Sequence, residues 1–184
     1  GLVILNGIGR NITLSGGTFN DLTLDNGLVG YWRLDDGTGS TVARDSSRNA
    51  NHGTLTNINT NTGWILNTTP AGNTGTTFYN PYSLDFDGSD DYVEAPDDNS
   101  LDVTTPTLMA WIKADAFGGR MIDKITSGGS DGFLFDTFGS KIRSCAANSC
   151  GSGNTTLSTG TWIHVALTND GTTTRFYLNG LPDG

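Results

Sequence analysis

Glutamate, basic residues and long apolar runs are scarce in this sequence, and each scarcity excludes a class of protein. Glu94 is the single glutamate among 19 acidic residues, Lys and Arg together number 10, and the formal net charge is -9 at pH 7. Such a chain lacks the basic face that nucleic-acid phosphates require, and an anionic membrane surface repels it. No apolar run approaches the roughly 20 residues that cross a bilayer. We therefore expect neither nucleic-acid binding nor membrane insertion.

Helix signals are also missing, whereas turn and strand signals are abundant. The chain has 26 glycines among 184 residues, and no window carries a sustained apolar stripe with helical period. Roughly ten short apolar segments are bounded by Gly, Asp or Ser, which is typical of a β-sandwich. The clearest are 28–34, 83–96, 107–114, 118–125, 131–138, 141–146, 161–170 and 173–180. Of these, 83–96 alternates around an Asp-Gly turn and predicts a hairpin.

The first 26 residues differ from those that follow. Two similar units, NITL at 11–14 and DLTL at 21–24, predict a hairpin or the end of a preceding β-rich region. A lone hairpin is too short to fold independently. We therefore divide the chain into an N-terminal β-rich segment at 1–26, which packs on the main domain or on a neighbour, and one domain at 27–184.

Two cysteines lie close together in the run SCAANSCG. A structural zinc site normally needs four ligands, and His52 and His164 are the only other candidates of the nitrogen type. Four intervening residues can form a hairpin loop that brings Cys145 and Cys150 to disulfide distance. The interpretation is a local disulfide made in an oxidising compartment, with free thiols as the alternative.

A polar loop of 19 residues, from Asp35 to Gly53, is the first candidate for chemistry. Loops this long inside compact domains are usually functional, metal-bound or disordered. Calcium prefers carboxylate and amide oxygens, and the loop offers Asp35, Asp36, Asp45, Asn49 and Asn51. The sequence thus predicts a structural Ca²⁺ here. The alternative is that Asp45 only caps a turn through its own backbone.

Aromatic residues in polar surroundings are candidates for stacking on a sugar ring. Trp64 lies in the polar run NTGWILN, and with Tyr79 and Tyr82 it forms the predicted ligand-binding set. The alternative is a satellite hydrophobic cluster under a long loop. The remaining tryptophans lie in apolar segments and are expected in the core: Trp32, Trp111 and Trp162.

Catalysis is not expected. A glycosidase needs two carboxyl groups placed across the scissile bond, and Glu94 is the single glutamate. Asp85 and Asp87 alternate around Phe86, but the family resemblance described below implies that this segment is a structural strand. His52 and His164 are interpreted as hydrogen-bonded structural residues.

Five segments together resemble the laminin-G-like jelly rolls of the concanavalin-A-like lectin/glucanase superfamily, in their bacterial form. The segments occur in the family's order: 27–55, 83–96, 107–114, 161–171 and 175–180. The resemblance implies an all-β, two-sheet antiparallel jelly-roll sandwich, often with one structural Ca²⁺, in secreted and surface proteins. It also implies further strands after residue 180, so the domain at 27–184 is expected to be incomplete at its C-terminus. Either the chain is cut short, or its far end is not seen, or another chain supplies the strands by addition.

Two functions follow as hypotheses. The first is a non-catalytic binding or adhesion module, secreted or on the cell surface, that recognises carbohydrate or glycoprotein. The second is a structural subunit of a surface fibre or layer, which would self-associate through strands shared between copies.

Overall fold

Every regular element but one in the described part of the chain is a β-strand. The exception is a short 3-10 turn, η1 (Asn99–Leu101), capped by the side chain of Asp98, which accepts a hydrogen bond from Ser100 N at 2.8 Å. The described residues contain no helix of the length and apolarity that spanning a membrane would require. The all-β prediction is confirmed. The computed structural model describes residues 2–6, 27–66, 80–125, 132–146 and 149–184.

Two large antiparallel sheets form the body of the molecule. The six-stranded sheet has the order β15-β14-β13-β8-β1-β2, and the four-stranded sheet has the order β12-β11-β10-β9. Strands of the first sheet are β1 (Leu2–Asn6), β2 (Leu28–Trp32), β8 (Pro106–Ile112), β13 (Ile163–Asn169), β14 (Thr174–Leu178) and β15 (Leu181–Pro182). Strands of the second are β9 (Arg120–Lys124), β10 (Phe133–Phe138), β11 (Lys141–Ala146) and β12 (Ser149–Ser152).

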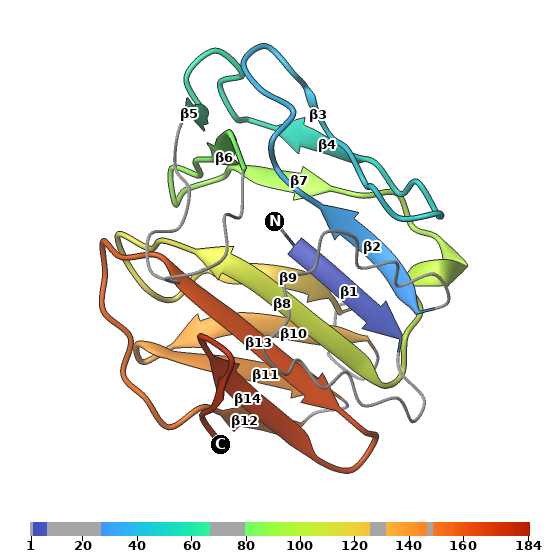
Figure 1. Cartoon of the computed structure of the whole chain (residues 1–184), viewed down its shortest axis with the longest axis vertical. Coiled ribbons are helices and arrows are strands. Elements are labelled where there is room, and N and C mark those ends of the chain that lie inside the picture. The colour runs from blue at the N-terminus through green and yellow to red at the C-terminus, as the bar shows by residue number, and fades with distance from the viewer. Residues whose placement is uncertain (1, 7–26, 67–79, 126–131, 147–148) are drawn as a thin grey trace, which may run out of the picture.

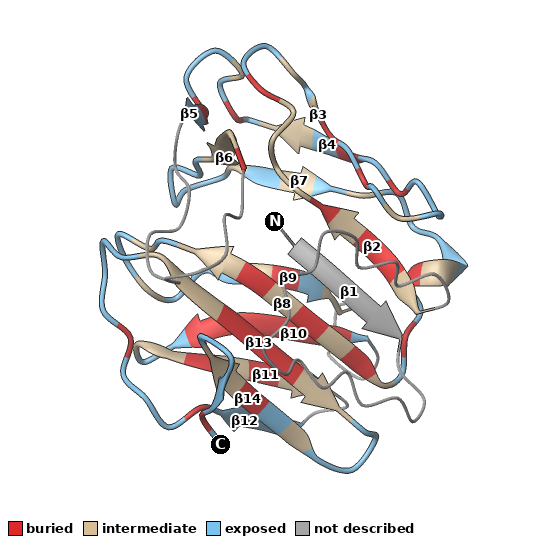
Figure 2. Cartoon of the chain, in the orientation of Figure 1, coloured by how far each residue is buried: buried red, intermediate tan, exposed pale blue. Residues whose placement is uncertain are grey.

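The two sheets pack face to face as a sandwich (Figure 1). Leu108, Val165 and Leu167 of the six-stranded sheet are fully buried in one core cluster with Phe135 and Ile142 of the four-stranded sheet. Figure 2 shows this burial as bands that run across β8, β10, β11 and β13. Alternate strand residues face the core because successive side chains point to opposite sides. The predicted two-sheet jelly-roll sandwich is therefore the observed architecture.

Strand β1 is an inner strand of the six-stranded sheet. It pairs with β2 on one side and with β8 on the other, both antiparallel. Residues 2–6 thus belong to the six-stranded sheet of the sandwich, which extends the sheet into the N-terminal segment predicted at 1–26. The predicted NITL and DLTL units at 11–14 and 21–24 lie outside the described residues.

Two small sheets lie at one end of the sandwich, beside β2 (Figure 1). One contains β3 (Val42–Ala43), β4 (Gly53–Thr56) and β7 (Tyr92–Glu94), and the other contains β5 (Trp64–Leu66) and β6 (Tyr82–Leu84). The hairpin predicted at 83–96 is wrong, because β6 pairs with β5 whereas β7 pairs with β4. The Asp-rich residues between β6 and β7 form a loop that joins the two small sheets.

Candidate functional site

The carboxylate of Asp45 organises the long loop between β2 and β4. The residue is only 5% exposed, and it accepts hydrogen bonds from the backbone N–H groups of Tyr31 at 2.7 Å and Asn51 at 2.9 Å. Ser47 donates two more, from its backbone N–H at 2.8 Å and its hydroxyl at 2.6 Å. A carboxylate has about four lone-pair directions, so these donors use all of them. The turn-capping interpretation of Asp45 is the one that this geometry supports.

The amide side chains of the same loop also serve as donors. Asn51 is 6% exposed, and its side-chain Nδ2 donates to Ser100 Oγ at 2.8 Å. Its backbone carbonyl accepts from Trp32 Nε1 at 2.8 Å. Asn49 Nδ2 donates to the carbonyl of Val29 at 2.9 Å. Both side chains therefore tie the loop to the sandwich.

The remaining two predicted calcium ligands form ion pairs. Asp35 pairs with Arg33 at 2.8 Å, and Asp36 pairs with Arg44 at 3.0 Å. The acidic members of the predicted set, Asp35, Asp36 and Asp45, do not form a group of converging carboxylates in the described part of the chain. Among the described residues, acidic, His and Cys ligand atoms converge in a group of three at one place only, and it lies in another loop.

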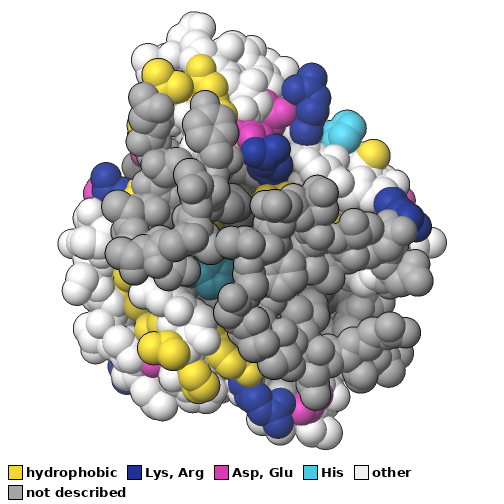
Figure 3. Space-filling model, viewed as in Figure 1, with side chains coloured by type: hydrophobic (Ala, Val, Ile, Leu, Met, Phe, Trp, Pro, Cys, Tyr) yellow, Lys and Arg dark blue, Asp and Glu magenta, His cyan; other side chains and the backbone are white. Residues whose placement is uncertain are grey.

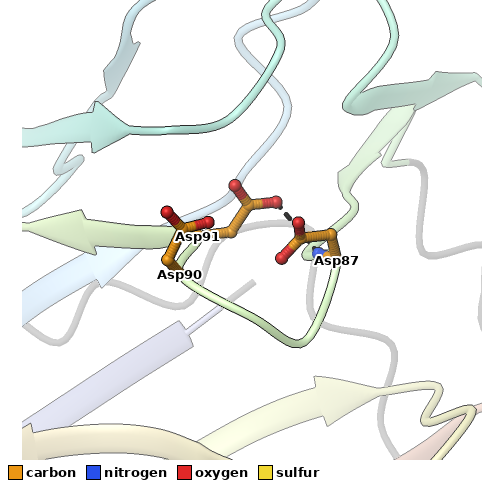
Figure 4. A group of neighbouring side chains, drawn as sticks. All are labelled: Asp87, Asp90 and Asp91. Atoms are coloured by element: carbon orange, nitrogen blue, oxygen red, sulfur yellow. Dashed lines mark hydrogen bonds between the residues drawn. The ribbon is translucent and has the colours of Figure 1, made fainter.

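That group is Asp87, Asp90 and Asp91, in the loop between β6 and β7 (Figure 4). One carboxylate oxygen of each lies within 4.8 Å of the others. The loop holds itself in shape, because Asp87 N donates to Asp91 Oδ2 at 2.9 Å and Asn57 Nδ2 donates to Asp90 Oδ2 at 2.9 Å. Clustered carboxylates are ligands that Ca²⁺ accepts. The run DGSDD could have indicated this cluster in the sequence. The cluster was not predicted because the whole segment 83–96 was interpreted as a hairpin.

The structure describes Trp64 and Tyr82 of the predicted aromatic ligand set. Trp64 is 4% exposed, its Nε1 donates to Ser40 O at 3.0 Å, and it lies outside the main core cluster. Its ring is therefore buried and offers no exposed face to a sugar. Tyr82 packs its ring against Gly37, where a Cβ would stand 3.2 Å from the ring. Tyr79 lies outside the described residues.

The tryptophans expected in the core divide into two groups. Trp32 is 6% exposed and belongs to the main core, as predicted. For Trp111 and Trp162 the prediction is wrong, because both are half-buried and neither belongs to the core cluster. Trp111 is on the outer face of the six-stranded sheet, with its ring edge against His164 at a centroid distance of 5.3 Å. Trp162 lines a surface pocket.

Both histidines have structural surroundings. Asp45 N donates to His52 Nδ1 at 3.1 Å. His164 lies in β13, and burial lowers its pKa below the usual 6.5. Its folded form therefore resists protonation.

Stability should fall as the pH drops through the range in which unfolded His164 titrates. Below about pH 6.5 the unfolded chain takes up a proton at His164 that the folded chain does not, so acid favours unfolding. We expect a lower Tm at about pH 5 than at about pH 7.5. Thermal melts of His164→Gln should show a shallower pH slope than the parent chain. An unchanged slope would contradict the assignment.

The predicted disulfide is present. Cys145 on β11 and Cys150 on β12 stand opposite each other in register and are bonded, with their Cα atoms 4.1 Å apart. No free cysteine remains. The bond fixes β12, the edge strand of its sheet. A chain that keeps this bond needs an oxidising compartment.

Removing the disulfide should cost moderate stability. For so short a loop, the lost constraint on the unfolded chain is worth about 2 kcal/mol. We expect the double variant Cys145→Ser with Cys150→Ser to lose about 2 kcal/mol of unfolding free energy, measured as a lower midpoint in denaturant unfolding. The control is a thiol titration of the unreduced parent chain, in which two reactive thiols would show that the bond is absent.

A shallow pocket of about 300 Å³ lies where the connection from β12 to β13 meets the end of β14. Its lining includes four hydroxyl-bearing residues between Thr155 and Thr161, the indole of Trp162, and the amide of Asn179. None of the described residues that line it is charged. Hydrophobic side chains also gather over β13 and β14 on the face shown in Figure 3.

Backbone and buried groups hold the pocket walls in place. Leu157 N donates to Ser140 O at 2.7 Å, which ties the wall to the β10–β11 hairpin. Thr155 donates to Asp183 Oδ1 twice, from N at 3.0 Å and from its hydroxyl at 2.5 Å. Asp183 itself is 7% exposed, and its Oδ2 has no hydrogen-bond partner among the described residues. These hydrogen bonds hold the rim of the pocket in place. The pocket was not predicted from the sequence because its walls come from separate segments.

The fold and these features place the chain among antiparallel β-sandwich proteins with a preformed surface pocket. A laminin G family model, described as the Concanavalin A-like lectin/glucanases superfamily, matches residues 87–184, which is more than half of the chain. The chain belongs to this superfamily. No curated protein and no solved structure matched it in comparisons of sequence and structure. The resemblance found in the sequence is confirmed for this region.

Proposed function

We propose that this chain is a non-catalytic carbohydrate-binding module that works outside the cell, as part of a secreted or surface protein. The observation that carries the proposal is the pocket at Trp162, because its lining combines an indole with hydroxyl and amide groups and bears no charge. A sugar ring presents an apolar C–H face and a polar edge, which suit an aromatic side chain and a few placed polar groups. The ligand class is thus a neutral carbohydrate, free or on a glycoprotein.

Binding without hydrolysis is part of this proposal. Glycoside hydrolysis uses a pair of carboxyl groups that flank the scissile bond. The described residues that line the pocket include no Asp or Glu, and the neighbouring Asp183 is buried and bonded to Thr155. The superfamily name covers both lectins and glucanases, and this uncharged lining supports the lectin alternative.

Calcium binding stays a prediction. The arrangement that the described residues offer a cation is the carboxylate group of Asp87, Asp90 and Asp91 rather than the loop 35–53. A cation that binds only the folded state raises the Tm. Thermal melts in Ca²⁺ and in chelator test this, and identical melts would exclude a stabilising ion.

A glycan array followed by calorimetric titration of the strongest ligand tests the proposed function. We expect retention of neutral oligosaccharides and no release of reducing sugar from them. Failure to bind any neutral glycan would overturn the proposal. Size-exclusion chromatography separates it from the structural-subunit hypothesis, since a fibre subunit would form polymers whereas a binding module needs no self-association.

A further inference from the structure

Two polar residues of the pocket lining have fixed and opposite hydrogen-bond character. The hydroxyl of Thr155 donates its only proton to Asp183 Oδ1 at 2.5 Å. Its remaining capacity is two lone pairs. Toward a ligand, Thr155 is therefore an acceptor, and Asp183 is the positioning residue that makes it one.

Asn179, which also lines the pocket, has the reverse character. Its Oδ1 accepts from His164 N at 3.0 Å, and its own backbone N–H donates to His164 O at 2.8 Å. Because a backbone N–H can only donate, the atom facing His164 must be the amide oxygen. The exposed side chain of Asn179 thus keeps its NH₂ group for donation to a ligand.

The lining also has apolar members. Trp162, Ile163 and Leu178 contribute to it, and none of the described residues that line the pocket carries a charge to balance an ionic ligand. A ligand that matches these features donates a hydroxyl proton to Thr155, offers an acceptor oxygen to Asn179, and places a small apolar group near Trp162. An acetamido group supplies the last two together, because its carbonyl oxygen accepts and its methyl group is apolar.

We infer that the pocket selects sugars with an acetamido group, that is, N-acetylated hexosamines. This inference rests on the proposed carbohydrate-binding function and names its ligand class. The acetamido carbonyl accepts from Asn179, its methyl packs on the apolar lining at Trp162, and a ring hydroxyl donates to Thr155.

The test compares two ligands that differ in the acetamido group alone. Chitotriose and cellotriose share the same linkage and ring configuration, but the first has acetamido groups where the second has hydroxyls. By calorimetry we expect the parent chain to bind chitotriose at least tenfold more tightly than cellotriose. Equal affinity for the two would overturn the inference and leave the proposed function standing. Binding of neither trisaccharide, nor of any neutral glycan on the array, would overturn both.

The variant Asn179→Asp assigns the preference to this residue. An aspartate can keep the bond from His164 N and tolerates the positive φ of 49° found there. It replaces the donor group by an acceptor, so we expect the preference for chitotriose to disappear. Asn61→Asp, at an exposed position between β4 and β5, makes the same change of charge away from the pocket and should keep the preference. A preference that survives in Asn179→Asp would contradict the assignment.

Discussion

Replacing Asp45 by alanine is expected to lower the free energy of unfolding by about 4 kcal/mol. The substitution removes the acceptor of four hydrogen bonds, three of them from backbone N–H groups. A buried donor left without a partner costs about 1–3 kcal/mol, and Asp45 lies at a site that is only 5% exposed. Because a domain of this size has about 5–15 kcal/mol of stability, the loss is a large share of the total.

Denaturant unfolding followed by tryptophan fluorescence measures this loss, since Trp32 is bonded to the same loop. Asp97→Ala is the control, because it removes the same carboxylate from a side chain that is 92% exposed. We expect the control to change stability by no more than about 0.5 kcal/mol. Asp45→Asn, which keeps the shape but turns one acceptor into a donor, should fall between them and gives a result even if the alanine variant does not fold. Equal losses in Asp45→Ala and Asp97→Ala would contradict the role of Asp45.

Replacing Trp162 by alanine is expected to weaken carbohydrate binding about 30-fold, which corresponds to about 2 kcal/mol. The indole is the aromatic surface of the pocket and sits in the segment that leads into β13. Its ring lies outside the main core cluster, so its removal should affect ligand affinity more than stability. Calorimetric titration with chitotriose measures the affinity, and a thermal melt of the same sample reports stability.

Two companion variants make the result specific. Trp162→Phe keeps an aromatic face and should retain most of the affinity. Phe138→Ala removes an aromatic residue that is 62% exposed at the end of β10 and is not among the described lining residues, and it should leave the affinity unchanged. If Phe138→Ala weakened binding as much as Trp162→Ala, the ligand would have to bind elsewhere.

The fold was predictable because local signals agree with the global architecture. The segments 107–114, 131–138, 141–146 and 161–170 become β8, β10, β11 and β13, with polar turns where Gly and Asp indicated them. The turn from β10 to β11 illustrates why. Gly139 and Ser140 both have positive φ, 56° and 62°, which is the backbone of the two-residue turn that joins adjacent antiparallel strands. The sequence does not show which distant segments pair with each other. For that reason β6 and β7 were wrongly predicted to pair with each other in a hairpin.

The tryptophan assignments failed for a different reason. Trp111 and Ile112 are neighbours in β8, and adjacent strand residues face opposite sides. Sequence alone shows two apolar residues there and does not say which faces the core. The structure puts Leu108 and Ala110 inward, so Trp111, one residue out of phase with them, faces outward beside His164. Trp64 shows the opposite error. Its polar neighbours in the sequence suggested exposure, but the residue is buried and bonded to Ser40 O in the loop 35–53.

The pocket could not be found by reading along the chain. Its walls come from the residues before β13 and from Asn179 after β14, which meet only because those two strands pair. Asp183, which orients Thr155, lies beyond both. A threonine-rich run ending at Trp162 was visible in the sequence, but nothing there tied it to Asn179 or Asp183.

The central claim is that a neutral sugar binds against Trp162, and titration of ¹⁵N-labelled protein with chitotriose tests it most directly. Each of the four tryptophans contributes one indole N–H resonance, and the missing peak in Trp162→Phe identifies the one that matters. We predict that this resonance shifts with added sugar while those of Trp32 and Trp64, whose N–H groups are bonded to Asn51 O and Ser40 O, stay in place. An unmoved Trp162 resonance at saturating sugar would contradict the account.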